Sequence, residues 1–453
     1  MERVIQYLRS PETRRRQVED LKALCRIPSV SARGEMEPLV EAVRWVEERL
    51  RRIGLTTRLL DGQGGPPVLL AEGRGSAPRT LLFYNHADVQ PPEPLDAWVS
   101  PPFEPEERDG FLYGRGTADN KGSLLSRVYA VEAFMAVHGR LPVNVKFLVE
   151  AEEESGSPHL DAVVQANREL LHCDAAIWEN ARKDDRGRPT AQLGNKGMVK
   201  IELRLRVSKT DFHSGFAPLY PNALWRLTWA LSTLKGPDGK ITIPGFYDRV
   251  LPFTEADAEL CRTLPANVEE HKARMGLDRL LPGDDPAAVN RALFYEPTVN
   301  IQGIAGGYTG PGVKTVIPSA AMARLDCRLV MDQDPDEIFE LVKRHLHDQG
   351  FTEIEAEILG RSWPRRTPPD HPFVGLVAET ARETYGQDLV LLPTSGGTSP
   401  QYVFRFIPGL PVVNLGVSHM DCRQHAPNEN IRIQDLYEGT EHIARILGRW
   451  AAA

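Results

Sequence analysis

Two residues with chemically useful side chains, His86 and Asp88, close the apolar stretch LLFYNHADV at residues 81–89. Side chains alternate along a strand, so positions 86 and 88 point to the same side. A strand that simply turns polar as it leaves the core would look the same. An imidazole beside a carboxylate is also how proteins orient a metal-binding histidine. The stretch is therefore consistent with a metal site. Other segments of the chain would have to supply the remaining ligands.

Three consecutive glutamates, Glu152 to Glu154, follow a second apolar stretch at residues 143–151. Charge runs are usually solvated surface, but this one stands at an expected strand end and before a Ser-Gly-Ser turn. Adjacent carboxylates at a strand end point in different directions. One can bind a metal while the other holds a water, which is the division of labour in metal-assisted hydrolysis.

Three further segments offer ligands of the same kinds. Asp119 precedes a helix expected from Gly122, where it serves either as a helix N-cap or as a carboxylate that bridges two cations. Glu179, in WEN, comes just after the short apolar segment AAI and is either a surface glutamate or a ligand at a strand end. Of the two histidines in SHMDCRQHAPNEN, the HAPNE context favours His425 over His419.

The combined ligand set contains imidazoles and carboxylates without thiolates: His86, Asp119, Glu154, Glu179 and His425. Such a set suits zinc, with manganese or cobalt as alternatives. Charge balance favours two divalent cations, because three carboxylates and one hydroxide offset four positive charges. Asp88 then orients the His86 ring.

The glycines around Arg115 in GRGTADNKG allow another interpretation, a nucleotide-binding loop. The segment lacks the spacing of a Walker sequence, and G-R-G-T does not continue as G-x-G-x-x-G. Failure to bind nucleotide would exclude this alternative.

The segments that must position these residues alternate between strand and helix, as in α/β proteins. Residues 12–53 are patterned as helix up to Gly54, apolar stretches follow at 67–73, 80–89 and 143–151, and 121–139 is patterned as helix. Ligands gather at the carboxyl ends of strands in such sheets. From Gly197 the pattern changes to the strictly alternating strand 198–207, a helix at 222–234, a loop-rich stretch at 235–297, a strand at 322–330 and a helix at 336–346. We therefore expect a first domain from 1–197 and 367–453, interrupted by an α+β domain over 198–366.

Bulk properties narrow the class of protein. A chain of 453 residues predicts two or three domains. A net charge of −8 argues against nucleic acid or an anionic membrane as a partner. The five cysteines are scattered, so no disulfide framework is expected. Since the sequence shows no signal peptide or membrane-spanning stretch, we expect a cytoplasmic protein.

The motifs NHADVQP, GRGTADNKG, EAEEESGS, DFHSG, CRLV, SGGTSP and HAPNE together resemble the M20 clan of dinuclear metallohydrolases, and within it the dipeptidase branch of cytosolic nonspecific dipeptidase and carnosinase. The resemblance implies a catalytic domain with a mixed central sheet flanked by helices and an inserted ferredoxin-like lid and dimerisation domain. It implies one metal on His86 and Glu179, another on Glu154 and His425, and Asp119 bridging them, with a cis Asp119-Asn120 peptide. Glu153 becomes the general base that activates a metal-bridged water.

The resemblance also assigns residues outside the metal set. His213 is implied to reach the partner subunit's active site in a homodimer and to stabilise the oxyanion. Arg328 is implied to grip the substrate's terminal carboxylate, and the loop Ser395, Gly396, Gly397 and Thr398 lines it, together with His371.

Two departures from the dipeptidase pattern leave the substrate open: Asn120 replaces a usual aspartate, and Glu179 is typical of the carboxypeptidase and deacylase branches. The long lid and DFHSG favour hydrolysis of dipeptides or similar small amides with a free carboxylate. The alternatives are an N-acyl amino acid deacylase or carboxypeptidase and, in another class, a non-catalytic relative that binds peptide or metal.

Overall fold

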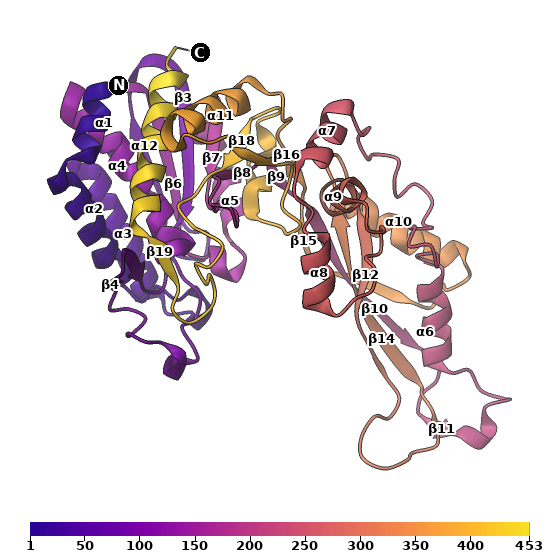
Figure 1. Ribbon diagram of the computed structural model, residues 1–453. Helices are drawn as coiled ribbons and strands as arrows, with labels where there is room; N and C mark the ends of the chain where they lie inside the picture. The colour runs from indigo at the N-terminus through magenta and orange to yellow at the C-terminus, as the bar shows by residue number, and fades with distance from the viewer. Residues whose placement is uncertain (453) are drawn as a thin grey trace. The chain divides into compact units, whose positions relative to one another are not determined.

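The computed structural model describes residues 1–452 and divides into two compact units (Figure 1). The first unit contains Met1–Gly194, Thr367–Pro393 and the chain from Val403 onward. The second contains Asn195–Arg366 and Thr394–Tyr402. Among residues 1–452, no helix combines the length and the apolar character needed to cross a bilayer.

An eight-stranded mixed sheet forms the centre of the first unit, in the order β1-β2-β6-β3-β7-β18-β8-β17. The strands are β1 (Thr56–Leu60), β2 (Val68–Gly73), β3 (Gly75–His86), β6 (Leu141–Glu150), β7 (Ala175–Trp178), β8 (Thr190–Gln192), β17 (Val390–Leu392) and β18 (Val412–Asn414). β6, β3, β7 and β18 run parallel, whereas β1 and β2 add antiparallel strands at one edge. The last six residues of β3 are all buried, which explains its uninterrupted apolar sequence.

Helices flank this sheet (Figure 1). α4 (Gly122–His138) packs on β3 and β6 and is itself covered by α1 (Glu2–Arg9), α2 (Pro11–Cys25) and α12 (Ile433–Trp450). α3 (Met36–Arg52) packs on β1 and β2, and α11 (Pro372–Tyr385) packs on α12. The helical pattern expected over 12–53 is therefore interrupted. Pro28 cannot continue a helix, and Gly34 adopts a left-handed φ of 68° between α2 and α3.

The second unit is built on a four-stranded antiparallel sheet in the order β12-β14-β10-β15. Along the chain its elements are β10 (Gly197–Arg206), α6 (Ala223–Ser232), β12 (Thr298–Gly306), β14 (Ala320–Leu329), α10 (Pro335–Asp348) and β15 (Glu355–Ser362). This βαββαβ order with these neighbours is the ferredoxin-like arrangement. The fold class predicted from the sequence is confirmed.

Two details of the second unit differ from the sequence prediction. The loop-rich stretch 235–297 contains three short helices, α7 (Glu255–Thr263), α8 (Val268–Met275) and α9 (Pro286–Tyr295). α7 begins with a Thr254 capping box and α9 with an Asp285 cap, local signals that are clearer than any apolar period. The outer strands β12 and β15 were not predicted from the sequence, because most of their residues are exposed or only partly buried.

Candidate metal centre

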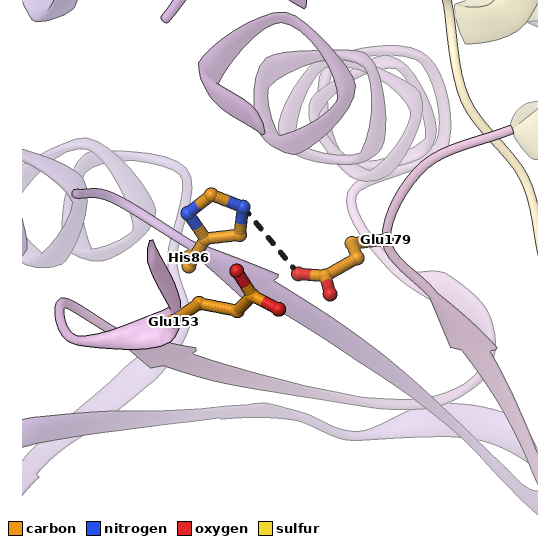
Figure 2. Close-up of side chains that lie close together, drawn as sticks. All are labelled: His86, Glu153 and Glu179. Atoms are coloured by element: carbon orange, nitrogen blue, oxygen red, sulfur yellow. Dashed lines mark ion pairs between the residues drawn. The ribbon is translucent and has the colours of Figure 1, made fainter. Parts of the chain in front are cut away.

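Three neighbouring strand ends bring four candidate residues together in the first unit. β3 lies between β6 and β7 and runs parallel to both, with His86 in register with Glu150. The segments after β6 and β7 carry Glu153–Glu154 and Glu179, so their side chains meet His86 at one edge of the sheet. Figure 2 shows His86, Glu153 and Glu179 directed toward one another.

Two loops add Asp119 and His425. Asp119 lies in the kinked turn Thr117–Lys121 ahead of α4, and its peptide bond to Asn120 is cis, as the family resemblance implies. The strand β19 (Asn430–Arg432) pairs with β5 (Phe111–Tyr113), which places the segment after His425 beside the segment before Asp119.

The five candidate ligands form two histidine–carboxylate pairs around one central carboxylate. Asp119 Oδ1 lies 3.2 Å from His86 Nε2, and Asp119 Oδ2 lies 3.2 Å from His425 Nε2. His86 Nε2 is 3.6 Å from Glu179 Oε2, and His425 Nε2 is 3.2 Å from Glu154 Oε2. The structure thus brings together all five predicted ligands, in the pairs that the family resemblance implies.

The donor set fits a metal ion. Glu154 Oε1 and Glu179 Oε2 are buried and have no hydrogen-bond partner within residues 1–452. A buried carboxylate oxygen without a donor is costly, and a cation would satisfy it. The ligand atoms of His86, Glu153 and Glu179, and those of His86, Asp119 and Glu154, lie within 4.8 Å of one another. Imidazoles and carboxylates at this spacing could hold a cation such as zinc, manganese or cobalt.

The charges of the cluster shift the pKa values of its members. Burial disfavours the charged His86 ring, but Glu179, Asp119 and Asp88 outweigh burial and raise its pKa. Hydrogen bonds to Asp119 and Glu154 raise the pKa of His425 to about 10. Burial alone would raise the pKa of Asp119, yet the two histidines lower it. Without a cation, imidazolium rings therefore balance the carboxylates.

Glu153 differs from the other carboxylates around it. Burial, with the negative charges of Glu154, Asp119 and Glu150, raises its pKa to about 8, and only His86 acts in the opposite direction among the main causes. A carboxyl group with this pKa takes up and releases protons near neutral pH.

Asp88 does more than the sequence predicts for it. Its carboxylate lies 3.3 Å from His86 Nδ1 and also accepts hydrogen bonds from the Glu153 N–H (3.2 Å) and the Glu154 N–H (3.0 Å). The side chain is fully buried. One carboxylate therefore holds both the histidine and the glutamate turn.

Glu429 is a residue that the sequence reasoning missed. Its buried carboxylate accepts hydrogen bonds from Arg115 Nη1 (2.8 Å) and from the backbone N–H groups of Gly116 (3.0 Å), Ala118 (2.9 Å) and Asp119 (2.9 Å). It thereby fixes the turn that presents Asp119. Its position four residues after His425, in HAPNE, was the available signal.

Amide side chains next to the ligands were also missed. Asn180 Nδ2 donates to Asp119 Oδ1 (2.5 Å), and its own oxygen accepts from Asn120 Nδ2 (2.9 Å). Asn85 donates to Asn120, and Gln90 Nε2 donates to Glu154 Oε2 (2.8 Å). Asn85 and Asn180 each adjoin a ligand in the sequence, which is the signal that could have found them.

Two histidines considered from the sequence have other contacts. His419 is buried, with Nε2 3.0 Å from Asn430 Oδ1. His371 caps α11 by accepting a hydrogen bond from the Phe373 N–H (3.1 Å). In residues 1–452, these hydrogen bonds do not join either ring to the five candidate ligands.

The other predicted site residues belong to the second unit. His213 is exposed, and its Nδ1 accepts a hydrogen bond from the Gly215 N–H (3.0 Å). Arg328 is partly exposed, with Nε 3.4 Å from Asp326. The loop from Ser395 to Thr398 is held by a bond from Ser395 Oγ to the Gly397 carbonyl (3.1 Å) and by the Lys196 N–H, which donates to the same carbonyl (3.1 Å).

Comparisons with known proteins find that this chain is similar to metallopeptidases. Beta-Ala-His dipeptidase of Homo sapiens is 31% identical over 407 residues, 85% of this chain and 78% of the relative. Cys-Gly metallodipeptidase of Candida albicans is 27% identical over 465 residues, 96% of this chain and 95% of the relative. The crystal structure of an M20 family metallo-carboxypeptidase from Sulfolobus solfataricus has a TM-score of 0.85 and 37% identity, and covers 96% of this chain and 99% of that one.

A family model agrees with these relatives. The description "Peptidase family M20/M25/M40" matches residues 82–449, a range that contains all five candidate ligands. The match extends over both compact units rather than one motif. On this evidence the chain belongs to the peptidase family M20/M25/M40 and is a dipeptidase-like metallopeptidase.

Proposed function

We propose that this protein hydrolyses the peptide bond of dipeptides or similar small substrates that carry a free carboxylate, and that it does so with two divalent cations. The observation that carries the proposal is the Asp119 carboxylate, which directs one oxygen to each of two histidine–carboxylate pairs. The dipeptidase names of similar proteins support the substrate class.

His86 and Glu179 would hold one cation, Glu154 and His425 the other, and Asp119 both. Zinc is the proposed metal, with manganese or cobalt as alternatives. When bound, the cations polarise the substrate carbonyl and lower the pKa of a water molecule.

Glu153 is the proposed general base. Its carboxylate accepts the proton of the attacking water and then gives it to the leaving amine, a sequence suited to its raised pKa. Asp88 positions this base, because its two oxygens hold the N–H groups of Glu153 and Glu154. The intact base argues against a non-catalytic binding protein.

The second unit would supply the substrate contacts and act as the lid over 198–366. Arg328 offers a forked guanidinium to the terminal carboxylate. The N–H groups of Ser395 to Thr398, together with His371 of the first unit, would line the same group. His213 would stabilise the oxyanion from the partner subunit of a homodimer.

Exposed apolar side chains on the second unit support the homodimer. β12 is an edge strand, with Ile301 46% and Ile304 51% exposed. On α6, the stacked indoles of Trp225 and Trp229 are 59% and 53% exposed. An edge strand and an apolar helix face of this kind are covered when two copies associate. The cytoplasmic location expected from the sequence remains part of the proposal.

A second candidate, carboxypeptidase or N-acyl amino acid deacylase activity, is favoured by Glu179 and by the similar Sulfolobus carboxypeptidase. Assays of the metal-loaded protein on unmodified dipeptides, N-acetylated amino acids and longer peptides separate the candidates. We expect release of amino acids from dipeptides, which stops on chelation and returns with metal. Turnover of the blocked amino acids alone would support the deacylase and reject the dipeptidase, and trimming of longer peptides alone would support the carboxypeptidase.

A further inference from the structure

A cavity of about 330 Å³ lies within the second unit, apart from the residues proposed for catalysis. Its walls come from α9, from the segment 240–253 and from chain segments that flank the strands of the unit. The volume is near the lower end of the range of small-molecule sites in proteins. A compact ligand would therefore fill it.

One part of the wall is apolar and aromatic. Val250, Leu251, Phe253, Phe294 and Tyr295 line the cavity. The Arg366 guanidinium lies 4.8 Å from the ring centroid of Tyr295, and that of Arg291 lies 4.7 Å from the centroid of Phe253. The cationic groups thus adjoin the apolar wall directly.

The lining of the cavity carries more basic than acidic side chains, although Arg366 also pairs with the buried Asp257 (3.4 Å). The basic lining residues are Lys196, Lys240, Arg291, Arg365 and Arg366, whereas Glu296 is the acid among them and is 3.2 Å from Arg291. Lys196 is 4% exposed, and its Nζ donates to the carbonyls of Glu296 (2.6 Å) and Ala292 (3.4 Å). Burial lowers the pKa of Lys196 to about 8, and the Glu296 carboxylate only partly opposes this effect. An anionic ligand would stabilise the buried ammonium further.

A buried donor adds a second, independent observation. The Tyr295 side chain is 9% exposed, and its hydroxyl has no hydrogen-bond partner within residues 1–452. Burial, and then the negative charge of Asp257, raise the pKa of this hydroxyl. Buried hydroxyl groups are normally hydrogen-bonded. This one lies on the wall of a cationic cavity.

We infer that the second unit carries a ligand site, separate from the metal centre, for a small organic anion with an apolar body and without an ammonium group. The apolar body would contact Phe253, Phe294 and Leu251, while the anionic group would meet the basic residues and the Tyr295 hydroxyl. A free amino acid fits less well, because its ammonium would face the same cations. The inference does not rest on the proposed hydrolysis.

Calorimetric titration of the full-length, metal-loaded protein with 3-phenylpropionate tests the inference. The neutral 3-phenylpropanol and the zwitterionic phenylalanine are the matched probes. We expect the carboxylate to bind at least about tenfold more tightly than either, since charge-assisted hydrogen bonds are the strong ones.

Variants locate the binding. Lys240→Ala and Arg291→Ala change exposed side chains, so the fold should tolerate them. The double variant should weaken 3-phenylpropionate about tenfold or more. Tyr295→Phe should weaken it by a smaller factor. Arg249→Ala removes a surface arginine of the same unit that pairs with Glu337, and it should change nothing.

Arg328→Ala separates this cavity from the proposed substrate contact and should leave the affinity for 3-phenylpropionate intact. The inference is overturned if 3-phenylpropionate does not bind at millimolar concentration, or if the alcohol binds equally well. It is also overturned if Arg328→Ala abolishes binding while the double variant does not.

Discussion

The two regions that carry the proposed chemistry are built in opposite ways. In the first unit, the Asp119 carboxylate is fixed by His86, His425 and Asn180, and its backbone N–H is held by Glu429. In the second unit, the exposed His213 ring accepts a hydrogen bond from a neighbouring glycine. Under the proposal, the fold of one chain positions the metal ligands, whereas substrate or a second copy completes the substrate contacts.

The contrast has a physical origin. Parallel strands that end at one edge place several polar residues together with little freedom, and buried polar groups there must be satisfied. Residues that meet a substrate must remain accessible until it binds. The following changes test this difference, from the largest expected effect to the smallest.

Glu153→Gln removes the proposed base and keeps the shape of the side chain. We expect kcat to fall by about 10²–10⁴-fold, the range of general acid–base catalysis, with metal content unchanged. Glu152→Gln is the matched control, because Glu152 pairs with His159 (2.8 Å) rather than with the cluster. Steady-state kinetics and elemental analysis provide the readouts. Wild-type activity in the Glu153 variant would show that Glu153 is not the general base.

His213→Ala tests the exposed region. Loss of one oxyanion donor typically lowers kcat by about 10²–10³-fold, and we expect a loss of this size without loss of metal.

Mixing His213→Ala subunits with Glu153→Gln subunits then decides where His213 acts. If His213 serves the partner subunit, each mixed dimer has one intact site, and random mixing restores about a quarter of wild-type activity. Failure of the mixture to recover activity, after subunit exchange has been verified, would place His213 in its own subunit's site or outside catalysis.

Glu429→Gln tests whether the metal centre depends on its supporting contacts. The amide cannot accept hydrogen bonds at both ends from the N–H groups of the Asp119 turn, so we expect metal affinity to fall about 10–100-fold. Glu441→Gln is the control, since this buried glutamate pairs with Arg9 instead. Competition with a chelator measures both. If the two variants bound the metal with equal affinity, Glu429 would not support the metal centre.

Metal loading should release protons. The raised pKa values of His86 and His425 favour protonated rings in the metal-free protein, and a cation requires the neutral ring. We expect metal binding to release protons, and metal affinity to rise with pH up to the pKa of His425, about 10. Calorimetry in buffers with different ionisation enthalpies measures the release. Heats independent of the buffer would contradict this.

The fold class and the grouping of the five proposed ligands could be predicted from the sequence because their signals are local. His86 and Glu154 adjoin apolar strands, and the motifs fixed the choice of His425 over His419. The supporting residues were not predictable in the same way. Glu429 and Asn180 act through contacts to a turn about 310 and 61 residues away in the chain, which only the folded sheet reveals. The cavity of the second unit could not be predicted from the sequence, because α7 to α9 lack a strong periodic pattern of apolar residues.

The most direct test of the central claim is the position and number of cations in a crystal of the catalytically active protein, determined by anomalous diffraction at the metal edge. The account predicts two cations, one between His86 and Glu179 and the other between His425 and Glu154, with Asp119 in contact with both. An active protein with no ordered cation among these five side chains would contradict it.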